Sequence, residues 1–202
     1  MKTLDEIILA RRTIRDFTDD IPSEEQIKMI LRAGLHAPFA SLAAQGGDKY
    51  RQFIIVGGQG EVIKEIRVLV QEQTKKFLKI IPFLNLFLKY KISETFKQRV
   101  QSDLLGSAPW YIFVVEPKGF PPAQKQSIAH CLENMWLKAT ELDLGFRPIS
   151  VFENMGSNQR LCDLFSLAKS RYVINCCAVG CPKEKMENSV RQNLDDISLW
   201  LR

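Results

Sequence analysis

One broad apolar stripe in the middle of the chain constrains the fold more than any other feature. Between Pro121-Pro122 and Gly145, apolar residues recur every three or four positions, as on one face of an α-helix. The stripe comprises Ile128, Cys131, Leu132, Met135, Trp136, Ala139 and Leu142. So wide an apolar face has to be buried against another element. We expect Gly145 to end this helix, because glycine favours the backbone conformation that follows a helix.

Short apolar runs on both sides of this helix predict the strands that it covers. Residues 53–56 form one such run before Gly57-Gly58, and residues 110–115 form another between two prolines. Two more strands are expected near 146–151 and at 172–179. Because strands and helices alternate, the chain belongs to the mixed α and β class.

The remaining helices are predicted from caps and periodicity. Capping boxes pair Thr3 with Glu6 and Ser23 with Gln26. Helical patterns also cover 59–80, 93–104, 157–167 and 194–201. We find no internal repeat or linker, so residues 1–202 are expected to form a single domain.

The positive charge of the chain is concentrated in one segment. The formal charge is +5, and residues 61–100 alone carry nine basic and four acidic side chains. A nucleic-acid-binding protein is expected to spread its positive charge along a face, so we expect no nucleic-acid partner. Because this segment is also apolar, the alternatives are a solvated surface, an anionic ligand, or transient contact with an anionic membrane surface.

The cysteines and the N-terminal residues predict a cytoplasmic protein. The five cysteines are an odd number, which fits reduced thiols better than a disulfide framework. The first six residues include three charged side chains where a signal peptide would be apolar, and no apolar run is long enough to span a membrane.

Neither the cysteines nor the histidines predict a metal or catalytic site. Cys176 and Cys177 are neighbours on an expected strand and therefore point to opposite faces, so we interpret them as small core residues. His36 and His130 each lie within a helical pattern, where packing or surface roles are expected.

The glycines that follow the first strand invite a dinucleotide-binding interpretation. Residues 57–60 read Gly-Gly-Gln-Gly, between an expected strand and an expected helix. The dinucleotide fingerprint would need a further glycine where this chain has Ile63. We therefore interpret the segment as a strand-to-helix turn.

A cluster of arginines predicts anion binding. Arg11, Arg12 and Arg15 lie within five positions, and the guanidinium group matches phosphate oxygens well. Thr13 adds a hydroxyl group that can bond a phosphate or a polyol.

These residues open a series of motifs that resembles the FMN-dependent nitroreductase family. The sequence ARRTIRDF at 10–17 resembles the basic N-terminal turn that holds the flavin phosphate and ribityl chain. Four further motifs follow in the family's order. They are AGLHAP at 33–38, LKATELDLG at 137–145, AVGCP at 178–182 and RQNLDD at 191–196.

The resemblance implies an α+β, nitroreductase-like fold, in which a small central mixed β-sheet is wrapped by helices. It also implies an intertwined homodimer with FMN sites completed by both chains, and apolar residues 199–201 suit such an interface. NADH or NADPH would reduce FMN, and a small aromatic acceptor, nitroaromatic or quinone-like, would take the electrons in a ping-pong reaction. A flavin-binding protein or redox sensor with little turnover is the alternative.

The resemblance also implies which residues bind the cofactor, with no side chain acting as catalyst because the flavin carries the chemistry. Gln45 is expected to replace the asparagine that is usual in the second flavin loop. The implied residues are Arg11, Arg12, Thr13, Arg15, Pro38, Phe39, Ala40, Ser41, Gln45, Arg147, Pro148 and Arg191.

An apolar segment at 76–92 has two interpretations, a buried helix pair or a lid over the flavin. Pro82 is expected to break any helix there. In the lid interpretation, Phe83 and Phe87 contact the acceptor, and the lysines of this segment surround an apolar entrance.

Overall fold

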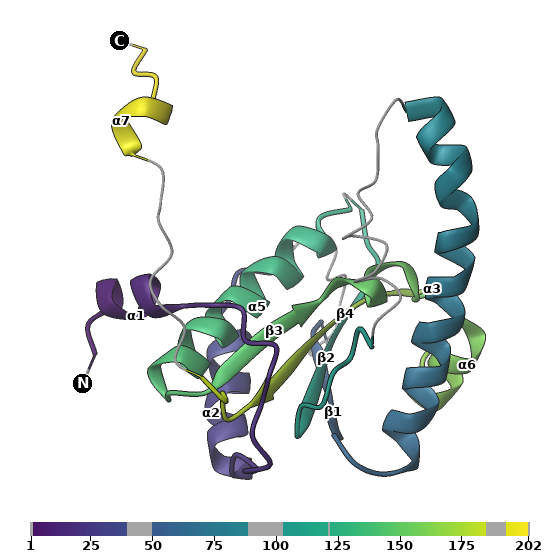
Figure 1. Ribbon diagram of the computed structural model, residues 1–202, viewed down its shortest axis with the longest axis horizontal. Helices are drawn as coiled ribbons and strands as arrows, with labels where there is room; N and C mark the ends of the chain where they lie inside the picture. Colours follow the sequence, from purple (N-terminus) through teal and green to yellow (C-terminus); the bar gives the residue numbers. More distant parts are fainter. Residues whose placement is uncertain (1, 40–49, 89–102, 121, 185–192, 202) are drawn as a thin grey trace.

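The computed structural model describes residues 2–39, 50–88, 103–120, 122–184 and 193–201, and side chains are described in these ranges apart from 80–88 and Leu194. A four-stranded sheet lies at the centre of the molecule (Figure 1). Its strands are β1 (Gln52–Gly57), β2 (Trp110–Pro117), β3 (Gly145–Ile149) and β4 (Tyr172–Gly180), in the order β1-β2-β4-β3.

The sheet is antiparallel rather than mixed. All three pairings between these strands are antiparallel, and the parallel contact in the described residues is an isolated bridge between Thr13 and Phe146. Gly57 at the end of β1 lies opposite Trp110 at the start of β2, so the chain leaves and re-enters the sheet at the same end of the strands. A connection of that kind makes neighbouring strands antiparallel.

Helices cover both faces of the sheet (Figure 1). Helices α2 (Glu24–Leu35) and α5 (Gln124–Glu141) pack on one face, and α3 (Glu61–Leu88) and α6 (Gln159–Leu164) pack on the other. The remaining elements are α1 (Leu4–Ala10), the short 3₁₀ helix η2 (Ser150–Asn154) and α7 (Leu194–Ile197). Both predicted capping boxes are present, at the starts of α1 and α2.

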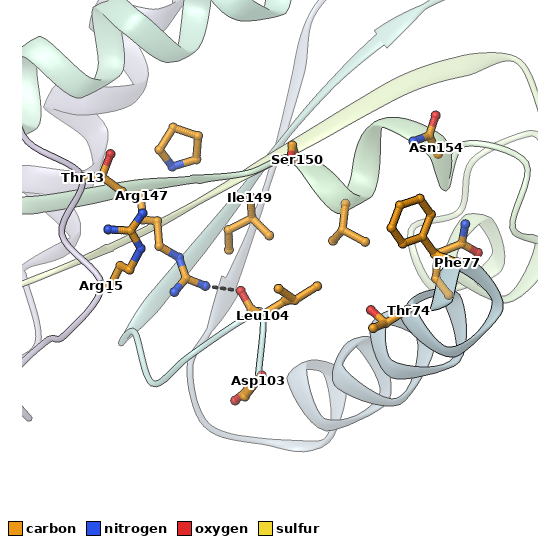
Figure 2. A pocket seen from close by; sticks show the side chains of 13 residues that line it. Thr13, Arg15, Thr74, Phe77, Asp103, Leu104, Arg147, Ile149, Ser150 and Asn154 are labelled. Atoms are coloured by element: carbon orange, nitrogen blue, oxygen red, sulfur yellow. Dashed lines mark hydrogen bonds between the residues drawn. The ribbon is translucent and has the colours of Figure 1, made fainter. Parts of the chain in front are cut away.

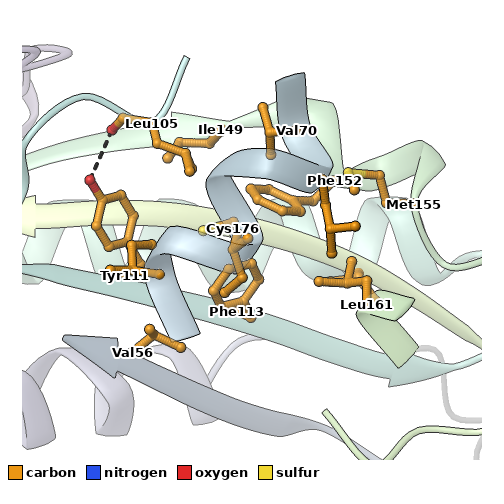
Figure 3. Packing of buried hydrophobic residues seen from close by; sticks show 14 of the residues in the cluster. Val56, Val70, Leu105, Tyr111, Phe113, Ile149, Phe152, Met155, Leu161 and Cys176 are labelled. Atoms are coloured by element: carbon orange, nitrogen blue, oxygen red, sulfur yellow. Dashed lines mark hydrogen bonds between the residues drawn. The ribbon is translucent and has the colours of Figure 1, made fainter. Parts of the chain in front are cut away.

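Each face of the sheet has its own apolar core, as the alternation of the strands requires. On the side of α3, Phe113 and Cys176 pack with Phe152 and Leu161 (Figure 3). On the side of α5, Cys177 belongs to the other core. The prediction that the paired cysteines point to opposite faces and serve as core residues is confirmed.

Helix α5 ends at Glu141, and Asp143 rather than Gly145 takes the left-handed conformation that follows it. Asp143 adopts the left-handed conformation, with φ of 57°, and the next amide, of Leu144, donates to the carbonyl of Ala139 at 2.8 Å. Aspartate tolerates this conformation better than most residues. Gly145 instead begins β3, where an added Cβ would lie 2.8 Å from Cγ2 of Ile14.

The predicted break at Pro82 is wrong, because α3 continues through it to Leu88. Proline removes one backbone hydrogen bond from a helix, while the other turns of a 28-residue helix are unaffected. The helix expected at 93–104 lies mostly outside the described residues, and the last helix ends at Ile197 rather than at 201. Among the described residues, no helix is long and apolar enough to cross a membrane.

The turn after β1 has a structural need for glycine, in agreement with its interpretation as a strand-to-helix turn. The amide of Gly58 donates to the carbonyl of Pro109 at 2.7 Å. A Cβ on Gly58 would lie 2.0 Å from the carbonyl oxygen of Ala108, which is backbone. The two segments therefore approach closely only because residue 58 has no side chain.

We expect Gly58→Ala to lower the free energy of unfolding by about 1–3 kcal/mol, since backbone has to shift to admit the methyl group. Gly57→Ala is the matched control, because the nearest atom to its added Cβ is 3.8 Å away. Urea unfolding of both variants measures the difference. Equal stability of the two variants would contradict the close approach.

Candidate functional site

A cleft of about 550 Å³ lies between the edge strand β3 and helix α3 (Figure 2). Its walls come from four parts of the chain: the segment after α1, helix α3, the turn before β2, and β3 with η2. The lining residues are Thr13, Arg15, Gln73, Thr74, Phe77, Asp103, Leu104, Arg147, Pro148, Ile149, Ser150, Val151 and Asn154.

The segment that carries Thr13 and Arg15 is held along the exposed edge of β3. The amide of Ile14 donates to the carbonyl of Phe146 at 3.1 Å, and the amide of Thr18 donates to the carbonyl of Cys181 at 2.8 Å. Between these two hydrogen bonds, the Phe17 side chain is buried in the apolar core on the side of α3. These contacts fix the segment at both ends and present Thr13 and Arg15 to the cleft.

Two guanidinium groups lie together at one end of the cleft. Figure 2 shows Arg15 and Arg147 beside Thr13, while Phe77 and Asn154 lie at the opposite end. Arg147 donates a hydrogen bond to the carbonyl of Leu104. Arg15 is exposed and makes no hydrogen bond or ion pair with another described residue.

Among the described residues, Arg147 forms no ion pair with a carboxylate, although Asp16 lies near enough to influence its charge. Burial lowers the pKa of Arg147, and the nearby charge of Arg15 lowers it further, while Tyr111 and Asp16 oppose this. An arginine nevertheless stays protonated near neutral pH. Two cations held close together in a cleft form a site for an anionic group.

The acidic residue in the cleft lining, Asp103, does not compensate these charges. Asp103 forms an ion pair with Arg67 of α3 and accepts a hydrogen bond from the amide of Leu105 at 3.0 Å. The buried hydroxyl of Tyr111 donates to the carbonyl of Gly106 at 2.6 Å in the same turn. The turn that forms one wall of the cleft is therefore fastened both to α3 and to the sheet.

The other end of the cleft is largely apolar. Phe77 lies there with Thr74 and Asn154, while Leu104 and Ile149 lie between this end and the two arginines (Figure 2). Val151 and Ser150 also line the cleft. Planar and apolar walls next to a cationic end suit an aromatic ligand that carries negative charge at one side. The α3 residues Gln73 and Thr74 were not predicted as site residues, since only the helix packing brings them here.

Four predicted site residues line this cleft, and two described arginines do not. Thr13, Arg15, Arg147 and Pro148 are among the residues that line it. The side chain of Arg11 lies toward α5, where its Nε is 3.1 Å from a carboxylate oxygen of Glu133. Arg12 donates to the carbonyl groups of Leu9 and Arg11, at 2.9 and 2.6 Å.

The predicted second loop begins away from the cleft. Pro38 and Phe39 line a smaller pocket of about 190 Å³ with Ser127 and His130. The carbonyl of Pro38 accepts a hydrogen bond from the buried Arg51 at 3.1 Å. Ala40, Ser41, Gln45 and Arg191 lie outside the described residues. Phe83 and Phe87 belong to α3, and their side chains lie outside what the structure describes.

Among the described residues, we assign no catalytic or metal-binding role to the histidines or the cysteines. His36 and His130 are both exposed on helices or at their ends. Burial raises the pKa of the Cys131 thiol to about 12, so this cysteine is not a thiolate near neutral pH. Within the described ranges, no three His, Cys, Asp or Glu residues are grouped as a metal site would require.

The chain thus combines a mixed α+β fold with a cleft at the sheet edge that is cationic at one end. The model of the Nitroreductase family matches residues 8–181, and the chain belongs to this family. No curated protein sequence matches the chain.

Solved structures share the fold at low sequence identity. The FMN-bound nitroreductase of Bacteroides fragilis NCTC 9343 has a TM-score of 0.74 and 16% identity, with 100% of each chain covered. The FMN-bound nitroreductase of Desulfitobacterium hafniense DCB-2 has a TM-score of 0.72 and 16% identity, again with 100% of each chain covered. A variant of NfnB, an FMN- and NADPH-dependent nitroreductase of Sphigopyxis sp. strain HMH, has a TM-score of 0.68 and 18% identity, covering 98% of this chain and 99% of its own.

Proposed function

We propose that this chain is an FMN-dependent oxidoreductase that uses NADH or NADPH to reduce a small aromatic acceptor. The observation that carries the proposal is the cleft, in which Arg15 and Arg147 face the same end and apolar residues form the rest. FMN-bound nitroreductases of the same fold support the choice of cofactor. NfnB, which is NADPH-dependent, supports the choice of electron donor.

The residues of the cleft fit a flavin. The isoalloxazine ring is planar, with an apolar benzenoid side and a polar side that attracts cations. Arg147 has a half-buried charge that donates a hydrogen bond to the neutral carbonyl of Leu104, so an anionic or strongly polar ligand group would complete its environment. The volume of about 550 Å³ is also within the range of small-molecule sites, roughly 300–1,000 Å³.

The role of the protein is to bind and orient the flavin and the substrates, since a bound flavin itself supplies hydride and electron transfer. Arg15 and Arg147 would hold the polar side of the ring, while Pro148 and the backbone after it would border the ring. Phe77 and Ile149 would exclude water from the apolar side. Ordered charges in a water-excluded cleft act more strongly than the same charges in solution.

For the phosphate and ribityl chain we propose Arg11, Arg12, Thr13 and Arg191. Each charge-assisted hydrogen bond to a phosphate is worth about 1.5–3 kcal/mol, so a few arginines suffice for firm binding. Pro38, Phe39, Ala40, Ser41 and Gln45 would complete the site from the second subunit. This assignment agrees with the position of Pro38 and Phe39 away from the cleft of their own chain.

We further propose that the protein is a homodimer. Leu199, Trp200 and Leu201 are 83%, 80% and 88% exposed, which leaves three adjacent large apolar side chains in water. Figure 1 shows the segment with α7 standing away from the sheet, where a second copy can cover it. Burying such residues is favourable by about 1.5–3 kcal/mol each.

The wild-type protein is therefore expected to sediment as a dimer at micromolar concentration. Changing Leu199, Trp200 and Leu201 together to serine should weaken this dimer by at least about tenfold, because the buried apolar area is lost. Sedimentation velocity over a range of concentrations measures the dimer dissociation of the wild type and of the triple variant. A wild-type monomer with FMN bound would contradict the proposal.

The acceptor would be aromatic and carry negative charge. Exposed Phe77 extends the apolar wall toward solvent, and the neighbouring Lys75, Lys76 and Lys79 are exposed on the same helix. A cationic surface around an apolar mouth favours anionic aromatic substrates. We propose Phe83 and Phe87, further along α3, as additional acceptor contacts.

Steady-state kinetics test the proposal. The purified protein should oxidise NADPH or NADH in the presence of a nitroaromatic acid or a quinone, with parallel lines in double-reciprocal plots. Parallel lines are expected because donor and acceptor react in turn at one cleft. Firm FMN binding without acceptor turnover would favour the alternative, a flavin-binding protein or redox sensor.

A further inference from the structure

Trp136 of α5 contacts the arginine segment in two ways. Its indole N–H donates to the carbonyl of Arg12 at 3.1 Å, and the guanidinium of Arg11 lies 4.2 Å from the centre of its ring. The ring also stacks on Phe146 of β3, with centroids 5.5 Å apart and an interplanar angle of 21°. Trp136 thus lies between the helix, the edge strand and the segment that crosses that strand.

Glu133, one helical turn before Trp136, holds a second side of Arg11. Its carboxylate is 3.1 Å from Nε of Arg11, so the guanidinium is fixed by its face and by its Nε edge. This ion pair is closest at Nε of Arg11, and the guanidinium also carries the terminal nitrogens Nη1 and Nη2. They are the two nitrogens with which arginine grips a phosphate in fork geometry.

We propose that Trp136 is the positioning residue that presets Arg11 for the flavin phosphate, and thereby sets the preference for FMN over riboflavin. This inference rests on the proposed function. An arginine that is already ordered loses less conformational freedom when it binds its ligand, so its contribution to affinity increases. Because riboflavin lacks the phosphate, it should not benefit from this ordering.

The experiment measures dissociation constants of FMN and riboflavin for the purified apoprotein, by quenching of flavin fluorescence. Wild type should bind FMN at least about tenfold more tightly than riboflavin, as one or more charged hydrogen bonds require. Trp136→Leu should reduce this ratio severalfold through weaker FMN binding, with riboflavin affinity unchanged. Trp136→Phe, which keeps a ring face but loses the N–H, should have a smaller effect.

Trp110 provides the matched control. Its indole N–H donates to the carbonyl of Pro22 at 2.9 Å, a similar bond that does not involve the arginine segment. Trp110→Phe should therefore leave the ratio at the wild-type value. If Trp136→Leu does not fold, Arg11→Lys tests the same point, since lysine keeps the charge but cannot stack and pair as Arg11 does; the ratio should fall.

The outcomes separate the inference from the proposed function. A ratio that falls in Arg11→Met but stays at the wild-type value in both Trp136 variants would overturn the inference, because Trp136 would then only pack. A ratio unchanged in Arg11→Met would overturn the assignment of Arg11 to the phosphate, and the inference with it. Failure of the wild type to bind either flavin would overturn the proposed function itself.

Discussion

Replacing Arg51 by methionine is expected to lower the free energy of unfolding by about 3–5 kcal/mol, the usual cost of removing one partner from a buried ion pair. The side chains of Arg51 and Glu116 are both fully buried, and Nε of Arg51 is 2.7 Å from a carboxylate oxygen of Glu116. Without Arg51, the carboxylate of Glu116 would be left in the core with no countercharge.

The loss should be large because Arg51 uses all its donors. Besides Glu116, its guanidinium donates to the hydroxyl of Ser127 and to three backbone carbonyls. The carbonyls belong to Gly34, Ala37 and Pro38, at 2.7, 3.3 and 3.1 Å. One side chain thus joins the end of α2 and the segment after it to β2 and α5, and methionine can make none of these bonds.

The pH dependence of the stability of Arg51→Met provides a second test of the buried ion pair. Burial raises the pKa of Glu116, and the hydrogen bonds from Arg51 and Ser127 oppose that rise. Removing Arg51 should raise the pKa further. A carboxyl whose pKa is raised by folding destabilises the protein as the pH increases through that pKa. The loss in free energy of unfolding of Arg51→Met relative to wild type should therefore become smaller as the pH is lowered toward the pKa of a free carboxyl group, about 4.

Arg160→Met is the matched control, because Arg160 forms an exposed ion pair with Glu72 at 3.0 Å. Such pairs contribute about 0–1 kcal/mol. Arg51→Met with Glu116→Leu should recover part of the loss, since no unpaired charge remains. Urea unfolding of the four proteins compares them, and equal stability of Arg51→Met and Arg160→Met would contradict the account.

Replacing Arg15 by glutamate is expected to weaken FMN binding by roughly a hundredfold or more, which corresponds to about 3 kcal/mol. The change removes a cation from the charged end of the cleft and places a carboxylate next to the ligand. Because Arg15 is exposed and has no described hydrogen-bond or ion-pair partner, the fold should keep its stability.

Lys28→Glu controls for the change in net charge. Lys28 lies on α2, which covers the opposite face of the sheet from α3. FMN titration of the apoproteins, with urea unfolding in parallel, measures both effects. If Arg15→Glu and Lys28→Glu bind FMN equally well, the cationic end of the cleft is not the flavin site.

Local signals predicted much of the fold. The capping boxes at Thr3 and Ser23 depend on residues three positions apart, so the sequence alone contains the whole interaction. The strands at 53–56 and 110–115 were also visible, as apolar runs bounded by glycine and proline. The end of α5 was misplaced because aspartate at residue 143 takes the conformation that glycine usually takes. The need for glycine at 145 arises from a distant contact with Ile14.

Local motifs indicate some residues of the candidate site, but not those that only tertiary packing brings there. Thr13 and Arg15 belong to a motif, and both line the cleft. Thr74 was not assigned, and Phe77 was included only within the segment 76–92 with its two interpretations, because only the packing of α3 beside β3 brings both to the cleft. The direction of Arg11 depends on Glu133 and Trp136, more than 120 positions away, and no local pattern indicates such a contact.

Anaerobic reduction of the bound flavin tests the central proposal most directly. The protein loaded with FMN should show the visible absorption of an oxidised flavin cofactor. Adding NADH or NADPH in the absence of oxygen should bleach this absorption, and a nitroaromatic or quinone acceptor should then restore it. A bound flavin that neither nucleotide bleaches would contradict the assignment of this chain as an NAD(P)H oxidoreductase.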